Sequence, residues 1–133
     1  MKLNDIILKE DVNQNELNAF AERVKQQLGL EEFDLRALKN NVIELELILV
    51  PRKLLGQGLG SKAMELLTYF ADSKGARLAL QTATKGKRKD WGTTSQNRLK
   101  KFYKRFGFVP NQGRHKDFTL SIYHHMYRNP KKN

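Results

Sequence analysis

The chain has 133 residues, which suits one domain with a genuine hydrophobic core and is short for two. It contains no cysteine, so disulfides, a thiol nucleophile and a cysteine metal cluster are excluded. The formal net charge is +11, and the excess lies in residues 74–133, which hold 16 Lys and Arg against 2 Asp and Glu and therefore favour anionic partners.

A strand and a helix are predicted in the first 30 residues. The apolar run Ile6–Leu8 indicates a short strand. Asp11 or Asn13 is suited to cap a helix that runs to about Leu28, in which apolar residues recur at helical spacing. Gly29 can adopt the left-handed conformation that ends such a helix.

Two neighbouring strands are predicted next. Residues 33–38 alternate in the manner of a half-exposed strand. Lys39-Asn40-Asn41 reads as a hairpin turn, because asparagine tolerates positive φ. Val42 to Val50 is mostly apolar, and it predicts the central strand of the sheet.

Helices and strands continue in the second half. Residues 60–73 have an apolar face at helical spacing, and residues 76–82 indicate a strand. A basic loop at residues 85–92 precedes a helix that begins near Thr93, Thr94 or Ser95 and ends at Gly107.

The C-terminal part is predicted to contain two further strands. One begins at Phe108-Val109, and the last runs from Phe118 to Tyr127. We expect residues 1–128 to form a single domain and residues 129–133 to be a disordered basic tail.

The most informative local pattern joins the central strand to the helix that follows it. Gly56, Gly58 and Gly60 occupy alternate positions there. Glycine lets the backbone turn tightly and approach a ligand closely, and the amide hydrogens at the start of a helix attract anions. The pattern therefore favours a phosphate-bearing ligand over a turn that needs glycine only for its shape. Its spacing fits neither the Walker A motif nor the dinucleotide fingerprint.

The glycine pattern resembles the acyl-CoA signature of the GNAT N-acetyltransferase superfamily, Arg/Gln-x-x-Gly-x-Gly/Ala, which falls here on Leu55–Gly60. Leu55 departs from it, because the family usually has Arg or Gln there, and Arg52 or Lys53 is a candidate replacement. Residues 98–109 resemble the late helix of the family, which ends in Phe-Tyr-x-x-Phe-Gly-Phe. The two segments follow each other in the order typical of that family.

The resemblance implies a fold and a cofactor site. The fold would be α+β, with a mixed, mostly antiparallel central sheet that is splayed at the cofactor site and flanked by helices. The co-substrate would be acetyl-CoA, with no metal. Its pantetheine would pair with the end of the central strand, and its pyrophosphate would lie on the amides of the glycine turn. The implied cofactor-binding residues are Ile48, Leu49, Val50, Leu55, Gly56, Gln57, Gly58, Leu59, Gly60, Ser61, Lys62 and Tyr103.

Acetyl transfer to a primary amine, by direct attack in a ternary complex, needs an acid near the departing sulfur and a base near the amine. Tyr103 occupies the position at which the family often has a tyrosine acid, and packing of the helix on the sheet is its alternative role. Glu44 and Glu46 are candidate bases, because period-two alternation puts both on the face of Ile48. Two solvent-facing carboxylates, or loss of the proton directly to water, are the alternatives.

The acceptor amine is left open. Because the second half is basic, an acidic protein or a nucleic acid is a candidate carrier of the amine, and a non-catalytic basic module that binds nucleic acid is the alternative function. Asp90, Trp91 and one of His124 and His125 are candidate acceptor contacts. The sequence shows neither a signal peptide nor a membrane span, so we expect a cytoplasmic protein without a membrane partner, either monomeric or homodimeric.

Overall fold

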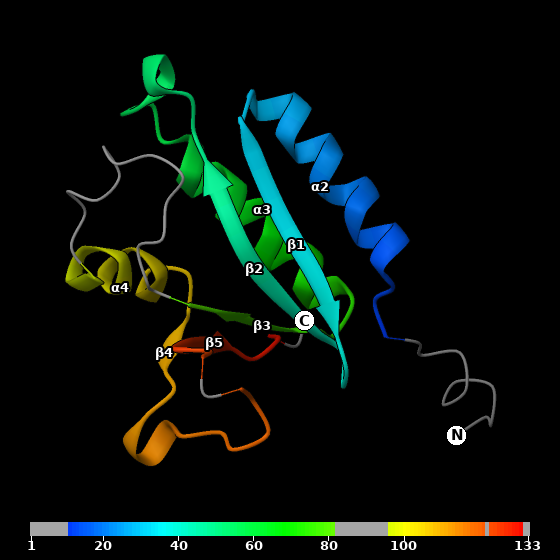
Figure 1. The fold of residues 1–133 in the computed structure, drawn as a ribbon, viewed down its shortest axis with the longest axis vertical. Helices are drawn as coiled ribbons and strands as arrows, with labels where there is room; N and C mark the ends of the chain where they lie inside the picture. The colour runs from blue at the N-terminus through cyan, green and yellow to red at the C-terminus, as the bar shows by residue number, and fades with distance from the viewer. Residues whose placement is uncertain (1–10, 82–95, 122, 132–133) are drawn as a thin grey trace.

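The computed structural model describes residues 11–81, 96–121 and 123–131. These residues form an α+β fold in which a mixed, five-stranded sheet is flanked by helices, as predicted (Figure 1). The predicted strand Ile6–Leu8, the basic loop, and the candidate contacts Asp90 and Trp91 lie outside the described residues. The elements are α2 (Gln14–Leu28), β1 (Glu32–Leu38), β2 (Val42–Leu49), η1 (Arg52–Leu54), α3 (Leu59–Ser73), β3 (Arg77–Leu80), α4 (Gln96–Lys104), β4 (Val109–Pro110), η3 (Gly113–His115) and β5 (Met126–Arg128).

The ends of α2 are those that the sequence predicts. Of the two candidate caps it is Asn13 that serves, since its side chain accepts a hydrogen bond from the amide of Glu16 at 2.8 Å. At the other end Gly29 has φ 71°, and its amide donates to the carbonyl of Lys25. Asp11 instead accepts from the amide of Asn41 at 3.0 Å.

The turn between β1 and β2 is also confirmed. Asn40 and Asn41 both have positive φ, 63° and 55°, which is the requirement of a two-residue hairpin turn between twisted strands. The side chain of Asn41 also accepts from the amide of Val12 and donates to the carbonyls of Lys74 and Gly75. One asparagine therefore ties the hairpin to the segments that precede α2 and β3.

The strand order in the sheet is β1-β2-β3-β5-β4. Among the described strands only the β2–β3 pair is parallel, and it extends from Val42 to Leu45. Beyond Leu45, β2 continues to Leu49 in antiparallel pairing with β1 alone among the described strands. The far half of β2 therefore has one side that β3 does not cover.

An irregularity in β2 reverses the predicted side-chain pattern. Asp34 lies opposite Leu47 and Leu35 lies opposite Leu45, so Glu46 is an extra residue, a β-bulge. Leu45 and Ile48 both contact the core as a result. Glu44 alternates with Leu45 and faces the opposite side, so the prediction that it shares a face with Ile48 is wrong.

The hydrophobic core lies between the sheet and the helices. Figure 1 shows α3 behind β1 and β2, and α2 beside β1. Phe20 of α2 stacks on Phe70 of α3 with ring centroids 4.2 Å apart. Fully buried core side chains come from both layers: Leu17, Ile43, Met64, Leu67, Leu78, Leu80 and Met126.

The end of the chain differs from the prediction of a strand over Phe118–Tyr127. Strand β5 covers only Met126–Arg128. The preceding segment is held in turns, because Asp117 accepts from the amide and hydroxyl of Thr119 and donates its own amide to the side chain of Asn111. Asn111 also donates to the carbonyl of His124 at 3.1 Å. Backbone pairing begins at His125, whose amide donates to the carbonyl of Leu80 and whose carbonyl accepts from the amide of Asn111.

Arg128 links β5 to the end of α3 and to the turn that follows α4. Its guanidinium donates two bonds to Asp72 near the end of α3, at 2.8 and 3.0 Å, and its Nε donates to the carbonyl of Phe106. Asp72 also accepts from the amide of Lys131, in the segment that we expected to be a disordered tail. No helix formed by the described residues is long and apolar enough to cross a membrane.

Candidate functional site

The glycine turn leads directly into α3. Gly56 and Gly58 have φ 85° and 73°, which other residues adopt only with strain, and Gly58 is the N-cap. The amide of Lys62 donates to the carbonyl of Gly58 at 3.1 Å and closes the first helical turn. The amides of Leu59, Gly60 and Ser61 precede that bond, so they are the amides that an α-helix leaves without an intrahelical acceptor. Such a turn can receive an anion.

An apolar cleft of about 310 Å³ lies beside this turn. It is bounded by the end of β2, the start of α3 and one face of α4. Its described lining is Ile48, Val50, Gly60, Arg98, Leu99, Phe102 and Tyr103. The volume falls within the range of roughly 300–1,000 Å³ that small-molecule sites have. The structure thus brings together predicted residues from three segments that are distant in sequence.

Gly60 belongs to both the turn and the cleft. A Cβ atom built on it would lie 3.7 Å from Cζ of Phe102, which is ordinary contact, so alanine fits sterically. A longer side chain would extend into the space between α3 and α4. Glycine at this position therefore keeps the backbone of the first helical turn open to the cleft.

At the end of β2 the backbone amides and carbonyls of successive residues point alternately toward β1 and away from it. The carbonyl of Leu49 accepts from the amide of Glu31 at 2.7 Å, so the polar groups of Leu49 face β1. Because successive residues of a strand alternate, those of Ile48 point to the side that β3 leaves uncovered. A strand edge of this kind can pair with the amides of an extended ligand.

Tyr103 lies on the face of α4 that packs against the core. Its ring makes edge contacts with Phe102 and Phe108, with centroids 5.2 and 5.6 Å apart. Burial raises the pKa of the Tyr103 hydroxyl to about 12, because the phenolate would be poorly solvated. The hydroxyl therefore remains protonated at neutral pH and can act only as a hydrogen-bond donor or acceptor, or as a weak acid.

Arg105 is a site residue that the sequence analysis missed. Its guanidinium donates to the hydroxyl of Ser61 at 3.2 Å and lies over the rings of Phe102 and Phe106, 5.5 and 5.6 Å from their centroids. It therefore places a cation at the first turn of α3, whereas Leu55, four residues before that helix, has an apolar side chain and is 49 % exposed. The spacing of Arg105 three residues after Phe102 was the available signal.

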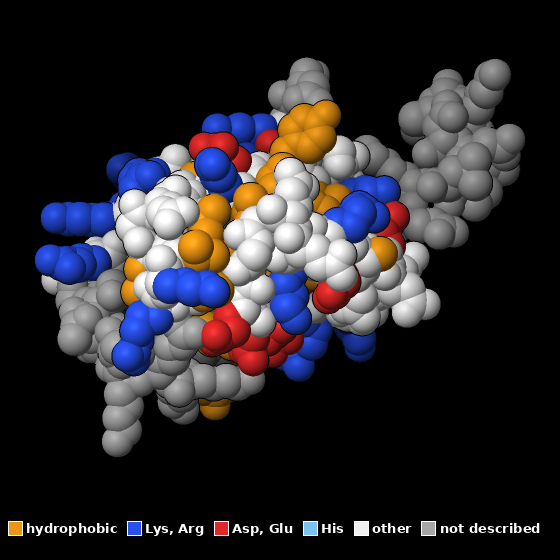
Figure 2. Space-filling view, turned by 90° about the horizontal axis from the view of Figure 1, so that it is seen from above, with side chains coloured by type: hydrophobic (Ala, Val, Ile, Leu, Met, Phe, Trp, Pro, Cys, Tyr) orange, Lys and Arg blue, Asp and Glu red, His pale blue; other side chains and the backbone are white. Residues whose placement is uncertain are grey.

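The remaining predicted cofactor contacts lie around the turn. Gln57 and Lys62 are exposed, and Arg52 and Lys53 are exposed in η1. Figure 2 shows Lys and Arg side chains gathered on the side where α4 lies in Figure 1. This surface is complementary in charge to a phosphate-bearing ligand.

The two predicted bases lie outside the described lining of the cleft. Glu44 is a buried residue, 8 % exposed. Its carboxylate hydrogen-bonds with Nε2 of His124 and lies 3.2 Å from the guanidinium of Arg36. Glu46 is 3.9 Å from the same guanidinium, and its side chain is 44 % exposed. His124 is buried and His125 is exposed. Within the described part of the chain, no group of three or more His, Asp or Glu side chains is placed to hold a metal ion.

Comparison with known proteins gives no relative from which function could be transferred. A scan of the sequence against models of protein families finds no match, and a search of curated proteins finds no significant match. Function is therefore inferred from the motifs and from the geometry of the cleft.

Proposed function

We propose that this protein is an acetyl-CoA-dependent N-acetyltransferase of the GNAT type. The observation that carries the proposal is that the glycine turn and the apolar cleft meet at Gly60. A turn that can receive an anion thus adjoins an apolar cleft at the point where β2 extends past β3. The two sequence segments that resemble the superfamily both contribute to this site, together with the end of β2.

The residues present suit the chemistry of acetyl-CoA. The amides of Leu59, Gly60 and Ser61 would receive the diphosphate, and Arg105 would add a cation beside them. The main chain of Ile48 would pair with the pantetheine amides. When bound, acetyl-CoA supplies the acetyl group as a thioester, which is activated toward attack by an amine.

Tyr103 is the proposed donor to the departing sulfur. Tyr103 lies in the wall of the cleft, and its hydroxyl stays protonated because burial raises its pKa to about 12. A thiol has a pKa of about 8.5, so full transfer of the phenol proton to a thiolate is unfavourable. The role that we assign to Tyr103 is therefore donation of a hydrogen bond to the negative charge that develops on sulfur.

Glu46 is the better placed of the two candidate bases. It is the extra residue of the bulge, two positions from Ile48, and almost half of its side chain is exposed. The carboxylate of Glu44 already contacts the guanidinium of Arg36 and Nε2 of His124, so it suits the positioning of these two side chains better than removal of the amine proton. We propose Glu46 as the group that takes the amine proton, directly or through water.

The proposal is tested by turnover. Purified protein is mixed with acetyl-CoA and a panel of primary amines, and the free thiol released is followed with a thiol reagent. We expect at least one amine to raise thiol release above the rate of slow hydrolysis, and mass spectrometry to find that amine heavier by one acetyl group. Thiol release without acetylated product would indicate a thioesterase instead.

A further inference from the structure

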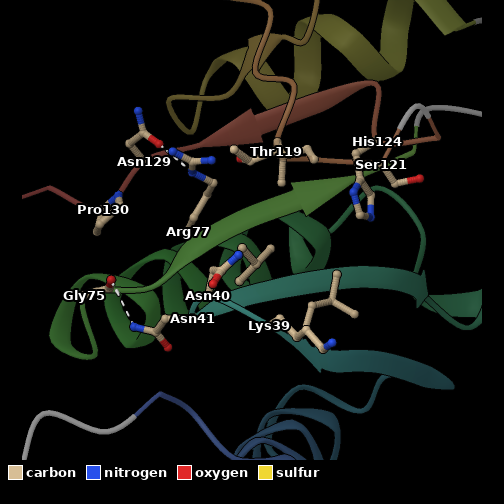
Figure 3. Close-up of a pocket in the computed structure, with 13 residues that line it drawn as sticks. Lys39, Asn40, Asn41, Gly75, Arg77, Thr119, Ser121, His124, Asn129 and Pro130 are labelled. Carbon is tan, nitrogen blue, oxygen red and sulfur yellow. Dashed lines mark hydrogen bonds between the residues drawn. The ribbon is translucent and has the colours of Figure 1, made fainter.

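A second, larger cavity lies on the sheet face turned away from α2 and α3. Its volume is about 620 Å³. Val42 and Arg77 line it, and each is followed in its strand by a core residue, so the cavity is separated from the core by the sheet. Figure 3 shows its residues in two facing groups, Lys39–Asn41 from the β1–β2 turn and Thr119, Ser121, His124 and Asn129 from the segments around β5, with Arg77 between them.

The lining mixes apolar and polar side chains and holds no acidic residue among those described. None of the described lining residues is acidic, whereas Lys39 and Arg77 are cationic. Arg77 is fixed in place, because Asp117 accepts from its Nη1 at 2.5 Å, Asn129 accepts from its Nε at 2.9 Å, and its guanidinium lies 5.4 Å from the ring centroid of Tyr127. Amide and hydroxyl side chains form part of the wall beside apolar ones such as Val42 and Leu120, and such polar groups can pair with the donors and acceptors of a nucleobase edge.

Two aromatic side chains are exposed to solvent on the segment before β5, which also contributes Thr119 to Ser121 to the lining of the cavity. Phe118 is 86 % exposed and Tyr123 is 64 % exposed, and they flank the lining residues Thr119–Ser121 in sequence. The ammonium group of Lys116 lies 5.9 Å from the ring centroid of Phe118. Exposed rings interleaved with cations are the features on which unpaired bases stack while their phosphates are neutralised.

We propose that this cavity and the segment around it bind single-stranded nucleic acid, with one nucleotide in the cavity and neighbouring bases on Phe118 and Tyr123. The cavity volume suits a ligand of small-molecule size, and the ammonium group of Lys39 offers a cation to a phosphate, whereas Arg77 is already paired with Asp117. A duplex keeps its bases stacked, so it does not offer their faces to these rings. The inference concerns binding alone and does not depend on acetyl transfer.

The test measures fluorescence anisotropy of a labelled 12-nucleotide single strand of mixed sequence at low salt. We expect Phe118→Ala and Tyr123→Ala each to weaken binding about 5- to 150-fold, the range that loss of one base–aromatic stack gives. Tyr69→Ala is the matched control, because Tyr69 is 78 % exposed but lies on α3, and it should leave binding unchanged. Both loop rings are exposed, so folding is expected to survive.

Two charge-reversal variants test the role of the cavity itself. Lys39→Glu and Arg23→Glu change the net charge equally, but only Lys39 lines the cavity, whereas Arg23 is exposed on α2. We expect Lys39→Glu to weaken binding clearly more than Arg23→Glu. Equal effects of the two, unchanged affinity in both aromatic variants, or a duplex bound as tightly as the single strand would overturn the inference. Equal competition by polyglutamate would overturn it in favour of an acidic protein partner.

Discussion

Replacement of Tyr103 by Phe removes one hydroxyl group and leaves the ring in place. The edge contacts of the ring with Phe102 and Phe108 do not involve that hydroxyl, so the melting temperature should be unchanged. Because the folded pKa is about 12 and that of a thiol is about 8.5, full proton transfer to a thiolate is uphill by about 5 kcal/mol. What the hydroxyl can contribute is a hydrogen bond to a developing charge, about 1.5–3 kcal/mol. We therefore expect kcat to fall about 10- to 150-fold.

The assay is steady-state thiol release at saturating amine, with acetyl-CoA affinity measured separately by calorimetry. Only kcat should change, because the hydrogen bond forms as charge develops on the sulfur. Tyr69→Phe is the control for loss of an exposed tyrosine hydroxyl. The native rate should also show no alkaline decline attributable to Tyr103 below about pH 11, because its pKa is about 12. An unchanged kcat in Tyr103→Phe would refute the role of this residue.

Three further predictions concern the cofactor turn, the base and the fold. Gly60→Glu places a carboxylate in the cleft and at the start of α3, so it should abolish CoA binding in calorimetry while the circular dichroism spectrum stays native. Glu46→Gln should lower kcat and remove the acidic limb of the pH–rate profile, and an intact limb would assign the base elsewhere. Asp72→Asn should cost about 3 kcal/mol of unfolding free energy at pH 7, measured by urea denaturation, because it removes the partner of buried Arg128. The hydrogen bond from Arg128 lowers the pKa of Asp72 below its ordinary 3.8, so this stabilisation is present above pH 3.8 and is lost as the pH falls through the folded pKa, where variant and native protein should converge.

The features predicted correctly from sequence are those that neighbouring residues determine. Asn13 and Gly29 set the ends of α2 through bonds within one helical turn. Asn40 and Asn41 set the β1–β2 turn because few other residues accept positive φ at consecutive positions. The glycine turn was located for the same reason, since its shape depends on the glycines themselves.

The features that were missed depend on contacts between distant segments. The bulge at Glu46 changes the direction of Ile48, and a strict period of two cannot reveal it. Strand β5 is shorter than predicted, and just before it the side chain of Asn111 donates to the carbonyl of His124. Arg105 reaches Ser61 across 44 positions. No local pattern in the sequence specifies the bulge, the Asn111–His124 bond or the Arg105–Ser61 bond, although the spacing of Phe102 and Arg105 indicates that they share one face of α4.

The most direct test of the account is calorimetric titration of coenzyme A into the native protein and into Gly60→Glu. The account predicts one site per chain in the native protein and no heat of binding in the variant. It also predicts that saturating coenzyme A, at about 100 times its Kd, stabilises the native fold by about 2.7 kcal/mol. Absence of binding to the native protein, or equal binding to both proteins, would contradict the assignment of the glycine turn and its cleft as an acyl-CoA site.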